Sequence, residues 1–468
     1  MCRAASLLAL ALVVASAPAE SAAGESGAVT GDDPPPTHDV PCDTERACVQ
    51  RLGRGHVCEA GRCAEYVDRR DLLSMIGMGH AESPRARAFE PFLAAVPVVG
   101  YSPSSGVLLG LAGQLGIVLG DPKDTTISNA TSTVLVTSKS QFIATLAATA
   151  LTPRNEFELL SDFRFLVFNQ DTFGLGTGTT PLATGVSVDG FGNLAALPGA
   201  QPMSFNLLRL HQSVLRRVFQ SFYLGIGYRL DRYYAIVDKD LNLSATPPVV
   251  TSHYAYSVLN GFDPAAYTTS GFALEAVSDS RDSTIAPYRG HLAHVGLSHR
   301  PTWLGSTKES SRVAGEGRLY IGLSDNVPRN VLALWIYGAG PIGGVTPYLA
   351  LPAIGWDATS TSGRGYVQGR FRGTSELYAE AELRFRISED GLWGGTVFVN
   401  ASTFSRPSVS LPQYGYSQSG ESLFANVKPA GGVGLRIMLI KQSRTNLRID
   451  LAGGVDSVCF YFGAGEAF

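Results

Sequence analysis

The sequence has few charged residues and lacks any long hydrophobic run after its first residues. Charged side chains make up 16% of the 468 residues, and the formal net charge is −3. A weakly negative chain gives no electrostatic basis for binding nucleic acid. The charge-free stretch 97–120 comes closest to a membrane helix, but its apolar part covers only 106–120 and is interrupted by glycine. A helical span needs about 20 apolar residues, so we expect no transmembrane helix in the mature chain.

Sequence motifs of common enzyme sites are also missing. The chain has no Gly-x-Ser-x-Gly elbow, no phosphate-binding loop and no dinucleotide-binding motif. Among the histidines, His291 and His299 share one face of a predicted strand and His294 lies on the other, so these three do not converge. We therefore expect no enzymatic activity, no cofactor and no metal site.

The sequence does contain apolar and polar residues in strict alternation. From residue 377 to 387 the odd positions are Leu377, Ala379, Ala381, Leu383, Phe385 and Ile387. The even positions are Tyr378, Glu380, Glu382, Arg384 and Arg386. A β-strand places successive side chains on opposite faces, so one face here is apolar and the other carries four charges. Similar alternation recurs at 157–167, 319–323 and 447–451.

This recurring pattern favours a transmembrane β-barrel over a soluble β-sandwich, because a barrel turns its apolar face to lipid and its polar face to the lumen. Candidate strands lie at 106–119, 129–139, 141–151, 155–168, 202–217, 219–233, 268–281, 290–300, 312–324, 330–340, 375–388, 392–402, 425–440, 445–454 and 457–468. Bacterial single-chain barrels have an even number of strands. We expect one more strand within 169–201 or 234–267, most simply at 249–259. The predicted fold is all-β, a transmembrane antiparallel β-barrel of about 16 strands.

The residues before the barrel have a different composition. Residues 1–22 resemble an export signal, with Arg3, an apolar run from Leu7 to Val14, and small residues at the cleavage site. Residues 23–96 are expected to form a periplasmic tether and a four-cysteine unit, and 97–468 the barrel. Export would place the barrel in the outer membrane of a bacterial cell.

Four cysteines are clustered in the tether region, namely Cys42, Cys48, Cys58 and Cys63. In an exported chain such spacing predicts two disulfides, with three connectivities that the sequence leaves open. A zinc site is the alternative, but no Cys-x-x-Cys pair is present. We therefore predict a small N-terminal segment stapled by disulfides.

Several motifs in the barrel region point to one family. The stretch 97–106, then Asp279-x-Arg281-Asp282 with a following Pro287 and Gly290, and then Gly363-Arg364-Gly365-Tyr366 occur in this order along the chain. They resemble, in turn, the entry to the first strand, a second motif, and the lumen-loop motif of the BamA/TamA-type assembly factors, the bacterial surface antigen barrels. Gly363 departs from the family, which has an apolar residue there. The final aromatic residue, Phe468, resembles the family's C-terminal strand signal.

The resemblance implies that Arg364 reaches into the lumen and meets an acidic residue on the second strand after the loop. Here Asn400 stands at that position. Other polar residues that the alternation or the second motif could place in the lumen are Glu380, Glu382, Glu275, Asp279, Arg281 and Asp282.

The resemblance also implies a role in outer-membrane protein assembly or translocation, with unfolded outer-membrane proteins as clients. We expect a monomer surrounded by outer-membrane lipid. Assembly factors of this family carry docking domains before the barrel, and the tether region leaves no room for one beside the cysteine unit. The alternative is therefore a passive pore or a structural outer-membrane barrel without insertase activity.

Overall fold

The strands of this protein are formed where apolar and polar side chains alternate along the chain, so that one face suits lipid and the other the lumen. The computed structural model describes residues 37–43, 45–52, 56–59, 62–65, 70–75, 88–102, 106–178, 199–324, 327–441, 443–455 and 457–468. The predicted export signal, residues 1–22, lies outside them. Among the described residues, no helix combines the length and the apolar character needed to cross a membrane.

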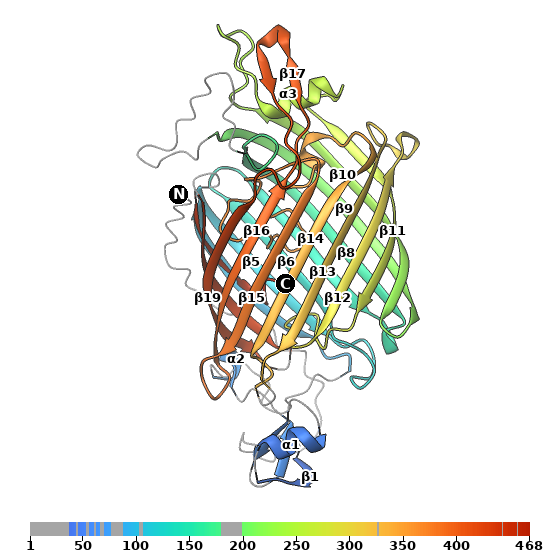
Figure 1. Cartoon of the computed structure of the whole chain (residues 1–468), viewed down its shortest axis with the longest axis vertical. Coiled ribbons are helices and arrows are strands. Elements are labelled where there is room, and N and C mark those ends of the chain that lie inside the picture. Colours follow the sequence, from blue (N-terminus) through green and yellow to red (C-terminus); the bar gives the residue numbers. More distant parts are fainter. Residues whose placement is uncertain are drawn as a thin grey trace, which may run out of the picture.

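Sixteen strands form one antiparallel sheet in which each strand pairs with its neighbours along the chain. They are β4 (Phe92–Ser102), β5 (Gly106–Ile117), β6 (Ser128–Thr137), β7 (Phe142–Leu151), β8 (Phe157–Thr172), β9 (Gln201–Phe219), β10 (Phe222–Asp238), β11 (Tyr267–Asp279), β12 (Gly290–Arg300), β13 (Ser310–Gly322), β14 (Val331–Gly344), β15 (Glu376–Arg386), β16 (Trp393–Phe404), β19 (Lys428–Ile440), β20 (Thr445–Gly454) and β21 (Val458–Ala464). Figure 1 shows the sheet curled into a barrel of tilted strands. The predicted all-β barrel is confirmed.

Smaller elements lie at the two ends of the barrel (Figure 1). One end carries β1 (Thr37–Pro41), α1 (Glu45–Leu52), β2 (His56–Glu59), β3 (Arg62–Glu65) and α2 (Leu72–Met75). The opposite end carries α3 (Ser252–Leu259) and a ribbon of β17 (Val409–Leu411) and β18 (Tyr416–Gln418). Four short 3₁₀ turns are η1 (Pro153–Asn155), η2 (Thr302–Leu304), η3 (Tyr348–Ala350) and η4 (Pro412–Tyr414).

The four clustered cysteines form two disulfides, as predicted. Cys42 is bonded to Cys58 and Cys48 to Cys63. The first bond links the residue after β1 to β2, the second links α1 to β3, and Cys48 and Cys63 are fully buried. A unit this small buries little apolar surface, so it depends on these covalent links for stability.

The missing sixteenth strand is β4, and its predicted location was wrong. Most of the stretch 249–259, which is rich in aromatic and β-branched side chains, forms α3 (Ser252–Leu259) instead. Thr251 caps this helix by accepting a hydrogen bond from the amide of Tyr254. The barrel therefore begins at Phe92 rather than at residue 97. Residues 97–102 belong to the second half of the first strand, where the edge position tolerates Pro97.

The outer surface of the barrel is a belt of exposed apolar side chains. In β15, Ala379 and Leu383 are exposed on the outside, whereas Glu380 and Glu382 are buried inside. The belt includes Leu224, Ile226, Leu274, Val295, Leu297, Ile336, Val397, Val399, Val433 and Leu451. Such a continuous apolar surface is stable in hydrocarbon and would aggregate in water.

The two edges of the sheet, β4 and β21, meet without a backbone ladder. In the described part of the chain each pairs on one side only. Ala94 of β4 lies opposite Gln114, which lines the lumen, so Ala94 is on the lumen face. It packs in one cluster with Leu447, which belongs to the lipid face of β20. The edges therefore overlap, and apolar side-chain packing holds them together.

Substitution on the lipid face tests the membrane assignment. Val399 lies midway along β16 and is 60% exposed, so Val399→Arg should lower the free energy of unfolding by about 2–4 kcal/mol. Ile387, just after β15, is also exposed, and Ile387→Arg should cost only about 0–1 kcal/mol because the strand ends lie near the interface. Urea unfolding in lipid vesicles measures both values. Equal costs at the two positions would contradict the assignment.

Candidate functional site

The connection between β14 and β15, residues 345–375, folds back into the lumen. Its apolar side chains Tyr348, Leu349, Tyr366 and Phe371 are buried against the inner wall. Burial of these side chains fixes the loop against strands from both halves of the sheet. We call residues 345–375 the lumen loop.

Glycines shape the tip of the lumen loop around Arg364. Gly363 and Gly365 have positive φ angles of 73° and 109°, which other residues rarely adopt. A Cβ on Gly365 would lie 2.8 Å from the Cβ of Ala430, so the wall leaves no room for a side chain. Gly363 replaces the apolar residue of the family motif. A Cβ added at this position would collide with Ile354 of the loop itself.

Arg364 is buried among three carboxylates. Its Nη2 donates to Glu380 and to Glu382 on β15, and its Nη1 donates to Asp450 on β20 over 2.8 Å. The guanidinium also stacks on the ring of Phe398, with 3.5 Å between its central carbon and the ring centroid. A buried cation is stable only when it is paired and hydrogen-bonded, and here the wall supplies both kinds of contact.

Further arginines of the wall complete the charge balance of this cluster. Arg436 pairs with Asp450 at 2.5 Å and with Glu466 at 2.7 Å. Arg384 donates to Glu382 over 2.6 Å. Carboxylates and guanidinium groups therefore alternate across β15, β19 and β20, and Arg364 links the lumen loop to this network.

Asn400 meets the main chain of the loop and not the guanidinium. Its side-chain amide donates to the carbonyl oxygen of Arg364 over 2.9 Å. The family resemblance implied an acidic partner at this position. In this chain the acids that contact Arg364 are Glu380, Glu382 and Asp450, so the neutral amide at 400 is free to hold the backbone.

Tyr366, the aromatic residue of the motif, anchors the loop to the last strands. Its hydroxyl donates to the carbonyl of Pro429 over 2.6 Å and accepts from the amide of Val455 over 3.2 Å. Gly454 makes space for the ring, since a Cβ there would lie 2.4 Å from a ring carbon. In addition, the amide of Gly365 donates to the Tyr461 hydroxyl of β21.

Asp357 organises the turn that precedes the motif. Its carboxylate accepts hydrogen bonds from the amide and hydroxyl of Ser362, at 2.8 and 2.6 Å, and from the amide of Thr361 at 3.1 Å. Burial acts to raise the pKa of Asp357, but the hydrogen bonds from Ser362 and Thr361 outweigh it and hold the pKa below its usual value. The loop turn therefore contains an ionised carboxylate at neutral pH.

The other residues expected near Arg364 lie elsewhere. Glu275 pairs with Arg229 and with His294 on the far wall. Asp279 forms a two-fold ion pair with Arg281 at the end of β11. Neither acid contacts Arg364, because β11 lies on the opposite side of the sheet order from β20.

The second motif closes a turn at the end of the barrel near α2. Asp282 accepts the amides of Tyr288 and Arg289 at 2.9 and 3.2 Å. Its second oxygen pairs with Arg444 of the β19–β20 turn at 2.6 Å. The motif thus has a structural role in joining two distant turns.

Phe468 lies in the lumen and not at the end of a strand. The predicted strand 457–468 is shorter, because Gly465 has a φ of 83° and turns the chain inward. The Phe468 ring stacks near Trp335 at 5.2 Å between centroids, and its main-chain oxygen accepts from Arg384 over 2.9 Å. A role of Phe468 as an assembly signal stays a prediction.

Sequence reasoning missed three members of the cluster, namely Asp450, Arg436 and Glu466. Asp450 alternates with apolar Leu447, Ile449 and Leu451, so its lumen position was predictable. Its contact with Arg364 was not, because the alternation does not say how far the loop reaches across the lumen.

The family follows from a comparison of sequences. The profile of the Omp85 superfamily domain matches residues 220–468, which include β10 to β21 and the lumen loop. The chain belongs to the Omp85 superfamily. This agrees with the family that the loop motif resembles, and an Omp85 barrel is an outer-membrane protein.

Solved structures provide two further likenesses to this Omp85 barrel. BamA from Haemophilus ducreyi lacking POTRA domains 1–3 is 14% identical, with a TM-score of 0.45, covering 81% of this chain and 71% of that one. The FrpB iron transporter from Neisseria meningitidis, F3-3 variant, is 10% identical, with a TM-score of 0.32, covering 81% and 59%. No curated protein sequence matches the chain.

Removal of the loop arginine should release the loop. Arg364→Ala leaves Glu380 buried without a cation and removes one of the cations that pair with Glu382 and with Asp450, so we expect a loss of about 3–5 kcal/mol in unfolding free energy and faster proteolysis within 345–375. Arg232→Ala removes an exposed arginine of β10 and should change stability by less than about 0.5 kcal/mol. Similar stability and cleavage rates for the two variants would contradict the role of Arg364.

Asn400→Asp distinguishes the observed contact from the family expectation. An aspartate cannot donate to the Arg364 carbonyl, so we expect the variant to lose about 1–3 kcal/mol of stability. Asn400→Ala, which removes the donor without adding charge, should be no less stable than Asn400→Asp. A variant Asn400→Asp that is more stable than the natural protein would show that residue 400 pairs with the guanidinium.

Proposed function

We propose that this Omp85 barrel assists the insertion or translocation of outer-membrane β-barrel proteins. The observation that carries the proposal is the seam, where β4 and β21 lack a backbone ladder in the described chain. An unpaired strand edge in a membrane exposes amide and carbonyl groups that another strand can pair with. An unfolded client could thus add its own strand at this edge.

The lumen loop supports this proposal by fixing one side of the seam. Arg364 connects β15 with β20, Asn400 of β16 holds the loop backbone, and Tyr461 of β21 binds Gly365. The last strands are therefore held as a unit by polar contacts. On the other side, β4 packs against β19, β20 and β21 through the apolar cluster around Ala94. The β4 edge is the side of the seam that separates more easily.

Orientation follows from the lengths of the connections. Near α2 the strands are joined by short turns such as 220–221 and 387–392, and at the other end by long segments such as 239–266 and 405–427. Outer-membrane barrels have short periplasmic turns and longer extracellular loops. The N-terminal disulfide-bonded unit then faces the periplasm.

We propose no enzymatic activity for this barrel. We also propose that it acts as a monomer, because one chain supplies all strands of the barrel.

Locking the seam tests this function. Cysteines at Ala94 and Leu447, joined by a reducible cross-linker, should abolish the protein's acceleration of client insertion into liposomes, and reduction should restore it. The matched control places cysteines at Ile226 and Leu274, which lie opposite each other in the β10–β11 ladder, where a cross-link should have no effect. The unmodified protein with reductant controls for the natural disulfides. Full activity of the locked seam would contradict the proposal.

The second candidate function is a passive pore or structural barrel. The observation in its favour is a lumen that retains a cavity of about 420 Å³ beside the loop. Equal client insertion with and without the protein, together with steady single-channel conductance that rises when the lumen loop is deleted, would establish this alternative in place of the first.

A further inference from the structure

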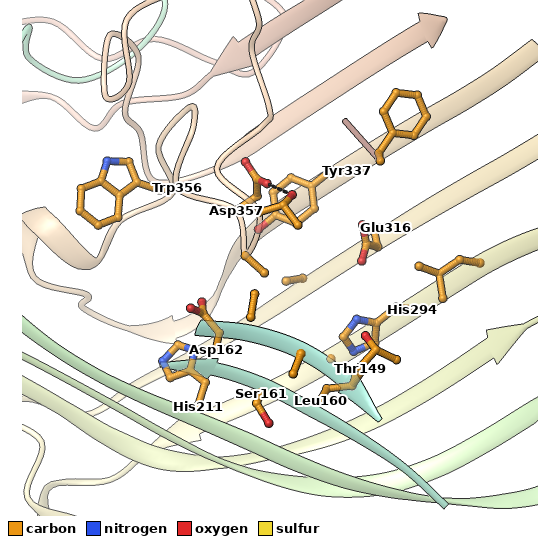
Figure 2. A pocket seen from close by; sticks show the side chains of 18 of the residues that line it. Thr149, Leu160, Ser161, Asp162, His211, His294, Glu316, Tyr337, Trp356 and Asp357 are labelled. Carbon is orange, nitrogen blue, oxygen red and sulfur yellow. Dashed lines mark hydrogen bonds between the residues drawn. The ribbon is translucent and has the colours of Figure 1, made fainter. Parts of the chain in front are cut away.

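The lumen cavity lies between the inner wall of β5–β14 and the lumen loop, away from Arg364. Figure 2 shows His294 and Glu316 on the wall, Asp162 and His211 on neighbouring strands, and Trp356 and Asp357 on the loop side. Its volume of about 420 Å³ is enough for a small solute.

Six arginines line the cavity, and four of them have a carboxylate partner. The paired ones are Arg209 with Asp231 at 2.6 Å, Arg229 with Glu275, Arg281 with Asp279 at 2.7 Å, and Arg318 with Glu316 at 2.9 Å. Arg300 and Arg312 form no ion pair with any carboxylate in the described chain. These two guanidinium groups therefore have no contacting carboxylate among the described residues, although Glu158, Asp162, Asp357 and Glu376 also line the cavity and Glu376 interacts electrostatically with Arg312.

Arg300 is the more unusual of the two. Its side chain is 7% exposed, and its buried Nε and Nη1 atoms have no hydrogen-bond partner among the described residues. The buried Nε of Arg312 likewise has none, and its Nη2 donates to the Tyr337 hydroxyl at a long 3.3 Å. Natural proteins rarely leave buried guanidinium donors unused, since each unmade hydrogen bond to a charged group costs free energy.

The sheet register brings the two arginines together on the lumen face, next to small residues. Arg300 lies opposite Ser310, and Arg312 is two residues further along the same face of β13. Such diagonal neighbours have Cα atoms about 7–8 Å apart, within reach of long side chains. The adjoining lumen positions are small, namely Ala273, Gly296 and Ala314, so space remains in front of the guanidinium groups.

Charges around Arg300 do not compensate it. Arg312, Arg209 and Arg229 act on it with the same sign, and Asp231 is the acid that opposes them. Asp231 already binds Arg209 and accepts from His211 at 3.2 Å. A planar guanidinium with free donors matches the oxygens of a phosphate or similar oxyanion.

We propose that Arg300 and Arg312 form an anion-binding site in the lumen, which takes a phosphate group, either as inorganic phosphate or on a solute small enough for the cavity. The anion supplies the acceptors that the wall does not, and the wall and the lumen loop enclose it. This site is separate from the seam, so it does not depend on the proposed role in client insertion.

Titration calorimetry of the purified barrel in detergent tests the site, with inorganic phosphate and glucose 6-phosphate as probes at constant ionic strength. We expect phosphate to bind, and Arg300→Gln and Arg312→Gln each to weaken binding at least about tenfold, because each removes charged hydrogen-bond donors. Arg318→Gln is the matched control from the same wall, and it should bind within about threefold of the natural protein because Arg318 is already engaged by Glu316. Tighter binding of the sugar phosphate than of phosphate would assign the site to a phosphorylated solute, and equal or weaker binding to the free ion.

Thermal unfolding without added anion gives an independent result. Arg300→Gln removes an uncompensated buried cation, so its unfolding temperature should equal or exceed that of the natural protein, and phosphate should stabilise only the natural protein. If Arg300→Gln fails to fold, Arg312→Gln carries the same comparison. Absence of phosphate binding to the natural protein, or equal binding by natural protein and both variants, would overturn the proposal.

Discussion

Hydrocarbon offers no water to unpaired backbone groups, and this constraint governs the whole structure. Every barrel strand except the two at the edges is hydrogen-bonded on both sides, and the apolar belt faces outward. The exception is the seam between β4 and β21, where Ala94 and Leu447 pack across an overlap in place of a ladder. A barrel that can open needs a position where separation costs little, and the seam is the position where the fewest hydrogen bonds must break.

The lumen loop connects strands that lie far apart in the sheet. Arg364 is held by carboxylates of β15 and β20, so breaking that contact removes a cation from buried carboxylates on two strands at once. The loop also contacts the first half of the barrel, because Arg164 of β8 donates to the carbonyl of Asp357 over 2.6 Å. These contacts join the lumen loop to strands on both sides of the lumen.

The sequence predicted most of this barrel because lipid and lumen select side chains with a period of two. Glu380 and Glu382 could be placed in the lumen from that pattern alone. Strand β4 escaped because its residues are apolar on both faces and include Pro97, and residues 249–259 were misjudged because tertiary packing and the Thr251 cap favour a helix there. The bond from Asn400 to the loop backbone, and the inward turn of Phe468 after Gly465, depend on contacts across the lumen that no local pattern encodes.

Hydrogen–deuterium exchange of the backbone amides in lipid vesicles tests the seam most directly. We expect fast exchange at the amides of β4 and β21 that point away from their one paired neighbour, compared with slow exchange in β10 and β11, which are paired on both sides. Protection of the β4 and β21 amides equal to that of β10 and β11 would mean that a continuous ladder closes the barrel, and it would contradict a seam without backbone hydrogen bonds.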